Sequence, residues 1–252
     1  MRFILVFLFI VLPFCSYSQL VNIESKRMQT DSTRYVFRAD LSSSYTNNNG
    51  DYLYLINSNL TAQVKSKDLN NILFLIGDYG LITSENVEFQ NAWFLHLRYN
   101  QELTELFRFE AFIQSQENKI LDINRRNLIG AGIRLKLLSK EHLRLYWGNA
   151  YMYEYERTND LDVEVYNHRY STYLSLSMSN KSNTLNLTNT CYYQPLLRDF
   201  GDTRILDQLK MNFQLTKKLS FFTLFEYFND SITLKDRSQY SINTSFGIGL
   251  NL

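Results

Sequence analysis

The chain ends in YSINTSFGIGLNL, Tyr240 to Leu252, where apolar side chains alternate with Ser, Asn and Gly up to the last residue. An apolar side chain at every second position is the period of a β-strand, whose successive side chains point to opposite faces. One face of this strand is therefore apolar, and the other is small and polar. The fold depends on whether the apolar face meets a protein core or lipid.

The same period recurs along the whole chain of 252 residues, which has 18 Tyr, 18 Phe and only two Pro. Such a composition favours strands, and we count about twelve of them, with a range of about ten to fourteen. The alternation is clearest in AWFLHLRY (Ala92–Tyr99) and LFRFEAFIQ (Leu106–Gln114). No later stretch approaches the roughly eighteen consecutive apolar residues of a helical membrane span. The sequence therefore predicts an all-β fold.

Residues 1–18, MRFILVFLFIVLPFCSYS, have the features of a secretory signal peptide. They comprise a basic residue, Arg2, then an apolar run from Phe3 to Leu12 and a small-x-small ending at Ser16 and Ser18. We predict cleavage after this segment and export of the remaining chain.

A lipoprotein signal with lipid on Cys15 is the alternative, although Phe14 stands where a small residue is preferred. After cleavage Cys191 is the one remaining cysteine, so no intramolecular disulfide can form. We divide the mature chain into an N-terminal lead at 19–33 and a single barrel at 34–252. Closing the sheet would satisfy its backbone groups without a disulfide.

The predicted connections between strands alternate in length. Short breaks such as SKDLNN and SKEH are followed by longer ones such as ENKILDINRR, RTNDLDVEVYN and DSITLKDRSQ, with TNNNGD the one short member of the long set. Outer-membrane barrels combine tight periplasmic turns, longer outer loops and an even number of strands. This pattern predicts a transmembrane antiparallel barrel in the outer membrane, with both chain ends on the periplasmic side.

A soluble, lipocalin-like barrel would also alternate, but several predicted strands run to about ten residues or more, and a tilted membrane strand needs about nine to eleven. The polar faces carry mostly Ser, Asn, Gln, Thr and Gly, which suits a lumen better than water. Two features argue against lipid: Asp207 is in phase with the apolar face of its strand, and the run through Ile72, Phe74 and Ile76 does not alternate. Aromatics at strand ends would form the interfacial girdles: Tyr45, Tyr52, Trp93, Tyr99, Tyr153, Tyr155, Tyr192, Tyr193, Tyr227 and Tyr240.

The sequence contains few residues that could form a catalytic or metal-binding site. Its three histidines are isolated from one another and from cysteine, and they are His96, His142 and His168. We therefore expect no metal site, no cofactor and no catalytic residues. The best candidate for a hydrolase is His168 beside Arg169, Ser171 and Thr172, a set that chance also explains.

Charged residues in phase with the small polar faces are predicted to line the lumen. Eight are basic and five are acidic, namely Arg38, Arg98, Arg108, Arg134, Lys136, Arg144, Arg169 and Lys210 with Asp40, Asp78, Glu110, Glu154 and Glu226. One interpretation is a structural salt-bridge network that plugs the barrel, and the other is a narrow pore with weak anion preference. A twelve-strand barrel lies between side-chain-filled eight-strand barrels and open porins, so the number of strands does not decide between a plugged barrel and a narrow pore.

The carboxy-terminal half, from TLNLTNTCYYQP to FEYFNDS, resembles a known family. The likeness is carried by YYQP at Tyr192–Pro195, by Asp202 and Arg204 in the following stretch, by KLS at Lys218–Ser220 and by YFNDS at Tyr227–Ser231. The sequence is similar to an uncharacterised outer-membrane β-barrel family that includes the putative salt-induced outer-membrane protein of enteric bacteria. The resemblance implies fold and location only, because that family has no established activity.

Three classes of function remain open. They are a narrow channel or envelope-stress barrel, a surface-binding barrel acting through its outer loops, and an outer-membrane hydrolase. Net charge is +1 for the whole chain, so no general attraction to nucleic acid is expected. The expected partners are outer-membrane lipid and the barrel-assembly machinery, whose recognition signal the final strand resembles, although Leu252 replaces the usual terminal aromatic.

Overall fold

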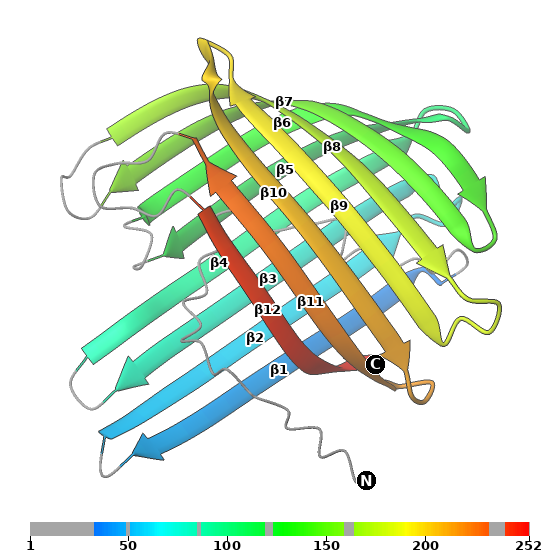
Figure 1. Ribbon diagram of the computed structural model, residues 1–252. Coiled ribbons are helices and arrows are strands. Elements are labelled where there is room, and N and C mark those ends of the chain that lie inside the picture. Colours follow the sequence, from blue (N-terminus) through cyan, green and yellow to red (C-terminus); the bar gives the residue numbers. More distant parts are fainter. Residues whose placement is uncertain are drawn as a thin grey trace, which may run out of the picture.

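Twelve antiparallel strands form one closed barrel in the computed structural model of the chain, which describes residues 33–48, 51–84, 87–118, 123–158, 164–231 and 240–251 (Figure 1). The strands are β1 (Tyr35–Asn48), β2 (Asp51–Lys65), β3 (Asn71–Ser84), β4 (Val87–Glu102), β5 (Phe107–Asn118), β6 (Ile123–Lys140), β7 (Leu143–Thr158), β8 (Glu164–Ser179), β9 (Leu185–Leu196), β10 (Asp199–Gln214), β11 (Leu219–Asp230) and β12 (Tyr240–Asn251). The predicted fold class and strand number are confirmed. The predicted signal peptide and all but one residue of the lead lie outside the described residues.

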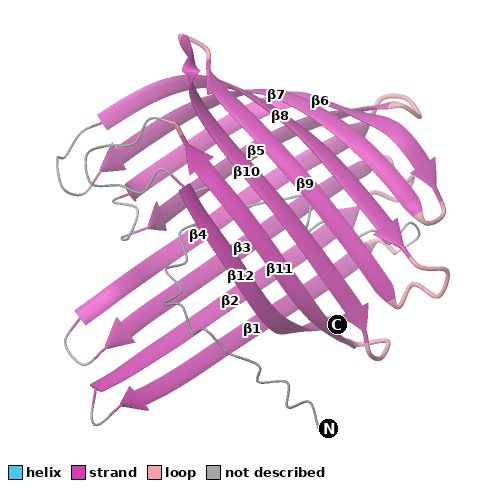
Figure 2. Cartoon of the chain, viewed as in Figure 1, coloured by secondary structure: helices cyan, strands magenta, loops and turns pink. Residues whose placement is uncertain are grey.

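Every strand pairs with its neighbours in sequence, and Figure 2 shows strands joined by short connections. The described ranges contain no helix with the length and hydropathy of a membrane span. We call the end of the barrel that carries the β2–β3, β4–β5, β6–β7, β8–β9 and β10–β11 connections the turn end, and the opposite end the loop end. β1 begins and β12 ends at the turn end.

The barrel closes between β12 (red in Figure 1) and β1 (dark blue), as the alternation in the last strand predicted. This seam has three Cα pairs, Arg38 with Asn251, Ala39 with Leu250 and Asp40 with Gly249. By contrast, β1 and β2 share fourteen pairs. A Cβ atom at Gly249 would lie 1.7 Å from Nη2 of Arg38, so a larger residue there would require the arginine side chain to move.

Apolar side chains cover the outside of the barrel on all sides. On β6, Ile129, Ile133 and Leu137 are 56%, 37% and 50% exposed. Comparable residues on other strands are Leu73, Leu95, Ile113, Leu174, Phe225 and Ile248. Soluble monomers rarely expose such continuous apolar surface, whereas the outer face of a membrane barrel requires it. The apolar face of each strand therefore suits lipid rather than a protein core.

This apolar belt covers only the turn-side part of the wall. On β6 the outward residues from Leu137 to Ile129 are apolar, and the next two, Asn127 and Arg125, are polar. Nine strand residues at about 3.3 Å each, tilted by about 40°, span about 23 Å, close to the usual apolar band of about 25 Å. The strands continue past this belt, so the barrel projects beyond the lipid at the loop end.

The predicted alternation of short turns and long loops is wrong for most connections, because the strands run through the stretches expected to be loops, although the β11–β12 connection, residues 231–239, is about as long as predicted. We expected about ten residues in ENKILDINRR and about eleven in RTNDLDVEVYN, but only 119–122 separate β5 from β6, and only 159–163 separate β7 from β8. Beyond the lipid, outward positions meet water and carry polar side chains. Both faces of a strand are then polar there, and the alternation that identifies strands disappears.

The two features that argued against lipid have structural explanations. Phe74 and Ile76 point inward and pack with Phe94 in a buried cluster, so β3 is apolar on both faces. Asp207 accepts a hydrogen bond from Nδ2 of Asn189 at 2.8 Å. Tyr227 lies opposite Asp207 on β11, at the edge of the belt, where a charge costs about 0–1 kcal/mol.

One of the aromatics assigned to the girdles was placed on the wrong face. Tyr192 is buried and packs inward against Tyr173, with 5.1 Å between ring centroids. Its neighbour Tyr193 is on the outside and 40% exposed. Consecutive tyrosines therefore serve opposite faces, as the period of a strand requires.

Replacing Ile133 by Arg should destabilise the folded barrel by about 2–4 kcal/mol, because the charge would lie at mid-belt. The free energy of unfolding, measured by denaturant titration in lipid bilayers, tests this. Asn127→Arg, on the same strand beyond the belt, is the matched control and should cost no more than about 1 kcal/mol. Equal costs at the two positions would contradict the proposed position of the lipid.

Candidate functional site

The inward side chains form three layers along the barrel axis, and together they are the candidate site. Nearest the turn end is a layer that we call the basic layer: Arg38, Lys65, Arg98, Arg108, Arg134, Lys136, Arg144 and Lys210. Aromatic and apolar side chains follow in what we call the middle layer. Beyond the belt, an ion network fills the lumen at the loop end.

Three carboxylates accompany the eight cations of the basic layer. They make ion pairs with three of them: Arg38 Nε to Asp40 Oδ1 at 3.0 Å, Arg98 Nη1 to Glu110 Oε2 at 3.3 Å, and Arg108 to Glu102. Among the described residues this end of the lumen therefore carries an excess of positive charge. Such an excess in a narrow interior raises the local concentration of anions.

Aromatic rings hold two further cations of the basic layer. The guanidinium carbon of Arg134 lies 3.6 Å from the ring centroid of Tyr146, and Nζ of Lys210 lies 4.9 Å from that of Phe222. Arg134 is buried, while Lys136, two residues further along β6, is half-buried. Stacking on a ring fixes the cation without neutralising it.

Short hydroxyl side chains line β8 and β9, which lie in the wall between β7 with Arg144 and β10 with Lys210. Oγ of Ser175 lies 2.9 Å from Oγ1 of Thr190, and Oγ of Ser177 lies 3.4 Å from Oγ1 of Thr188. These pairs explain why the strands read as Ser- and Thr-rich on one face. The basic layer therefore combines long cationic side chains with a stretch of small hydrogen-bonding groups on β8 and β9.

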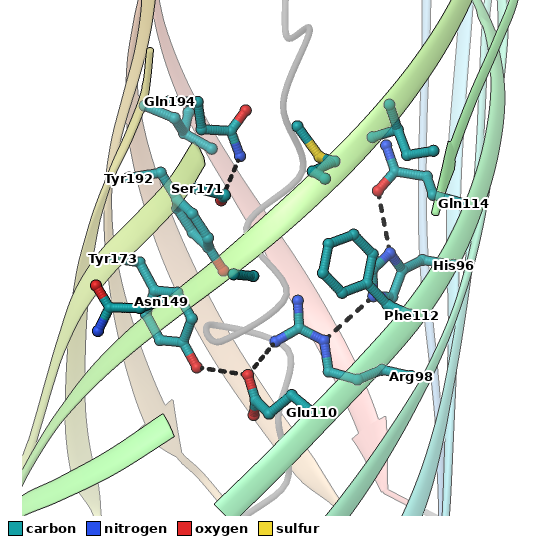
Figure 3. A pocket seen from close by; sticks show the side chains of 14 residues that line it. His96, Arg98, Glu110, Phe112, Gln114, Asn149, Ser171, Tyr173, Tyr192 and Gln194 are labelled. Atoms are coloured by element: carbon teal, nitrogen blue, oxygen red, sulfur yellow. Dashed lines mark hydrogen bonds and ion pairs between the residues drawn. The ribbon is translucent and has the colours of Figure 1, made fainter. Parts of the chain in front are cut away.

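A chain of hydrogen bonds joins the basic layer to the middle layer (Figure 3). Tyr173 on β8 donates its hydroxyl to Oε2 of Glu110 on β5 at 3.0 Å, and Arg98 reaches the same oxygen. Arg98 Nε lies 3.3 Å from Nε2 of His96, whose Nδ1 lies 3.0 Å from Oε1 of Gln114. The Tyr173–Glu110 bond spans the lumen, because β6 and β7 separate these two strands in the wall.

Two inward glycines make room for the rings of the middle layer. A Cβ atom on Gly148 would lie 2.0 Å from the ring of Tyr173, and one on Gly130 would lie 2.3 Å from the ring of Phe112. The rings therefore lie flat over bare backbone and extend into the lumen. Inward glycine in these strands reflects close packing against aromatic rings.

The middle layer leaves little free space between β4 and β10. A cavity of about 40 Å³ remains there, with Phe112, Met152, Tyr173, Tyr192 and Leu206 among the side chains that line it (Figure 3). At about 15–30 Å³ per molecule, this space holds about one to three waters. The wall between these strands encloses packed side chains, and a hydrated solute would have to displace them.

The ion network at the loop end is centred on Glu154, which is 1% exposed. Its Oε2 lies 2.6 Å from Nη1 of Arg204 and 4.0 Å from Nε of Arg126. Its Oε1 lies 3.6 Å from Nε of Arg169 and accepts a hydrogen bond from Asn167 at 3.2 Å. Three guanidinium groups thus surround one carboxylate that has almost no contact with solvent.

Further carboxylates complete the network. Arg126 Nε donates to Oε2 of Glu156 at 2.8 Å, Arg204 Nε donates to Oδ2 of Asp230 at 3.0 Å, and Arg169 Nη2 lies 3.0 Å from Oδ1 of Asp202. The network therefore contains three cations and four carboxylates. Its members come from β6, β7, β8, β10 and β11, so it cross-links about half of the barrel wall.

The structure places the predicted lumen charges in two groups and two outlying positions. Arg38, Asp40, Arg98, Arg108, Glu110, Arg134, Lys136, Arg144 and Lys210 lie towards the turn end, while Glu154 and Arg169 lie in the ion network. Asp78 accepts from Nδ2 of Asn59 at 2.5 Å, and Glu226 accepts from Gln208. The thirteen residues are therefore not one constellation.

Sequence reasoning missed most of the ion network. Arg126, Asp202, Arg204 and Asp230 were assigned to loops or their edges, and Glu156, at the end of a predicted strand, was omitted together with Lys65 and Glu102 at the turn end. The alternation of inward and outward side chains could have identified two of them as inward. Arg126 is two residues from inward Leu128, and Glu156 is two residues from inward Glu154. For Arg126, the loop assignment removed that information.

The candidate hydrolase residues are not brought together. His168 is on the outside, with Nδ1 2.5 Å from the hydroxyl of Tyr151, whereas Ser171 is buried inside and Arg169 belongs to the ion network. Thr172 is outward, and its hydroxyl contacts the indole nitrogen of Trp147 at 3.0 Å. Within the described ranges, no three His, Cys, Asp or Glu side chains are placed to hold a metal ion.

Replacing Glu154 by Gln should destabilise the barrel by about 3–5 kcal/mol, because three buried guanidinium groups would lose their shared carboxylate. The urea midpoint of the refolded barrel in detergent measures the effect. Glu105→Gln, in the exposed β4–β5 turn, is the control and should leave the midpoint unchanged. An unchanged midpoint for Glu154→Gln would show that the network does not stabilise the fold.

Solved structures with a similar fold are outer-membrane barrels. The NanC porin is 12% identical, with a TM-score of 0.50, and the match covers 86% of this chain and 98% of that one. The translocator domain of the autotransporter NalP from Neisseria meningitidis is also 12% identical, with a TM-score of 0.52 and coverage of 86% and 87%. At this identity the likeness shows the fold alone.

No curated protein matches the sequence. The specific likeness to the putative salt-induced protein stays a prediction, but a family assignment follows from the sequence itself. The model of the family described as "Protein of unknown function, DUF481" matches residues 21–251. The match covers every strand of the barrel, and the chain belongs to this family.

Proposed function

We propose that this chain is an exported outer-membrane barrel that gives narrow, side-chain-restricted passage to small ions or solutes, in connection with envelope stress or uptake. The observation that carries the proposal is the middle layer, which leaves a cavity of about 40 Å³ between β4 and β10. Porins of sixteen or more strands enclose wide aqueous channels, whereas the lumen of an eight-strand barrel is filled by side chains. A twelve-strand barrel is intermediate in diameter. We propose no enzymatic role.

The layers would act on a solute one after another. Positive charge at the turn end would favour anions, the middle layer would exclude hydrated solutes, and the ion network would hold the loop-end wall in place. A solute would pass only if rings such as those of Tyr173 and Phe112, which pack against glycine backbone, changed rotamer. Passage would therefore depend on the motion of these rings.

The proposed location rests on three supports. They are the apolar belt, the fold shared with outer-membrane barrels, and the signal peptide predicted at 1–18. Lipid would contact the belt, and the barrel-assembly machinery would act on the final strand, Tyr240 to Leu252. Heat-modifiable migration of protein extracted from outer membranes supports this location, while recovery in the soluble periplasmic fraction contradicts it.

A surface-binding role through the outer loops is the weaker alternative. The β1–β2, β3–β4 and β9–β10 connections are two residues long, and those between β5 and β6 and between β7 and β8 are four and five. Apart from the nine-residue connection between β11 and β12, residues 231–239, such connections offer little area to a partner. The outer wall beyond the belt, with Tyr155 and Tyr166 hydrogen-bonded to Glu164, is the remaining surface for such a contact.

Removing the two rings of the middle layer should open the barrel. Phe112→Ala combined with Tyr173→Ala should raise single-channel conductance in planar bilayers severalfold above the wild type, because both side chains occupy the lumen. Ile113→Ala combined with Leu174→Ala, at the neighbouring outward positions, is the matched control and should conduct as the wild type does. Unchanged conductance of the inward pair would contradict the proposed role of the rings.

Charge reversal in the basic layer should change ion preference. In the opened variant, Arg134→Glu combined with Lys136→Glu should shift the reversal potential under a KCl gradient towards cation preference, since two positive charges become negative. A reversal potential identical to that of the opened parent would assign these residues a structural role.

A further inference from the structure

We infer that the basic layer is a binding site for small polyanions that carry two or more phosphate or carboxylate groups and enter from the turn end. The inference rests on the proposed function, because it names the class of solute that the lumen would admit. Binding and conduction are nevertheless separate measurements. A barrel that binds a polyanion without conducting it would still contain the site.

Cationic residues are concentrated on three adjacent strands. Arg108 on β5, Arg134 and Lys136 on β6, and Arg144 on β7 lie within a few residues of the turn end. The register places Arg108 directly opposite Arg134 across the β5–β6 ladder. Like charges in this position repel one another, and Glu102, the ion-pair partner of Arg108, balances only part of the positive charge of these four residues.

Arg134 is arranged as an anion-binding group. Its guanidinium stacks 3.6 Å above the ring of Tyr146, and the residue is only 4% exposed. A guanidinium fixed in this way loses little entropy on binding a phosphate or carboxylate. Lys136, half-buried on the same strand, adds a second positive charge at the same level.

The adjoining strands β8 and β9 supply neutral donors. In the Ser175–Thr190 pair, one hydroxyl donates to the other, which leaves the second hydroxyl proton of that pair for a ligand. Lys210 lies opposite Thr188 on the next strand, so a further cation borders these strands. Guanidinium, ammonium and hydroxyl donors together suit a ligand with several anionic oxygens.

The direction of entry follows from the charge at the two ends. The basic layer has eight cations and three carboxylates among the described residues, while the ion network has three cations and four carboxylates. An anion is therefore attracted at the turn end and not at the loop end. The middle layer separates the two regions, so the ligand would stop against the rings of Tyr173 and Tyr192.

Isothermal titration calorimetry of the full-length mature barrel, refolded in a zwitterionic detergent at low salt, tests the site with tripolyphosphate and, separately, with citrate. The wild type should bind at least one of the two, which also identifies phosphate or carboxylate as the preferred group. Arg134→Gln combined with Lys136→Gln should weaken binding about tenfold or more, because two nearby charges are lost. Arg125→Gln combined with Lys181→Gln removes two exposed cations outside the layer and should bind as the wild type does.

Heat-modifiable migration establishes that each variant is folded before titration. Absence of binding by the wild type to both probes would overturn the inference, as would equal weakening in the two double variants. Binding that is lost only in the Arg134 and Lys136 variant supports the site even where the wild type carries no current. Current without binding would refute the site while leaving the proposed passage intact.

Discussion

Closure of a twelve-strand sheet is the constraint on which the rest of the structure depends. Once every backbone group is paired around the ring, half of the side chains of each strand must enter the lumen and the other half must face outward. The outward half meets lipid over a belt of about 23 Å, and the inward half is arranged in three layers along the lumen. The three layers of the lumen follow from this closure, because it directs half of the side chains of every strand inward.

Charge in the lumen is balanced differently at its two ends. At the loop end, where Glu154 is almost fully buried, each carboxylate has an arginine within about 4 Å and the network is close to neutral. Burying ions without partners is costly, so such a network forms only when it is nearly complete. At the turn end, cations outnumber carboxylates and several lie on aromatic rings or beside one another. A surplus of this kind stabilises nothing by itself, and it is the reason for assigning a ligand to that end.

Much of the barrel could be predicted from the alternation of residues, because lipid imposes a strict rule on outward positions. The closing strand and the inward phase of Arg98, Glu110 and Glu154 follow from that rule. Beyond the belt the rule ends, and Arg126 and Asp230 were therefore assigned to loops or their edges although they lie in strands. The bond between Tyr173 and Glu110 could not be predicted at all, since it depends on Gly148, two strands of separation and the curvature of the wall.

Closure of the lumen by the middle layer is the central claim, and cysteine accessibility tests it most directly. In a Cys191→Ser background, Ser171→Cys lies in the middle layer and Asn186→Cys lies near the turn end, both on inward faces. A water-soluble maleimide should modify the folded Asn186→Cys barrel readily and modify Ser171→Cys only after unfolding in denaturant. Modification of both folded barrels at the same rate would mean that water fills the lumen, and it would contradict this account.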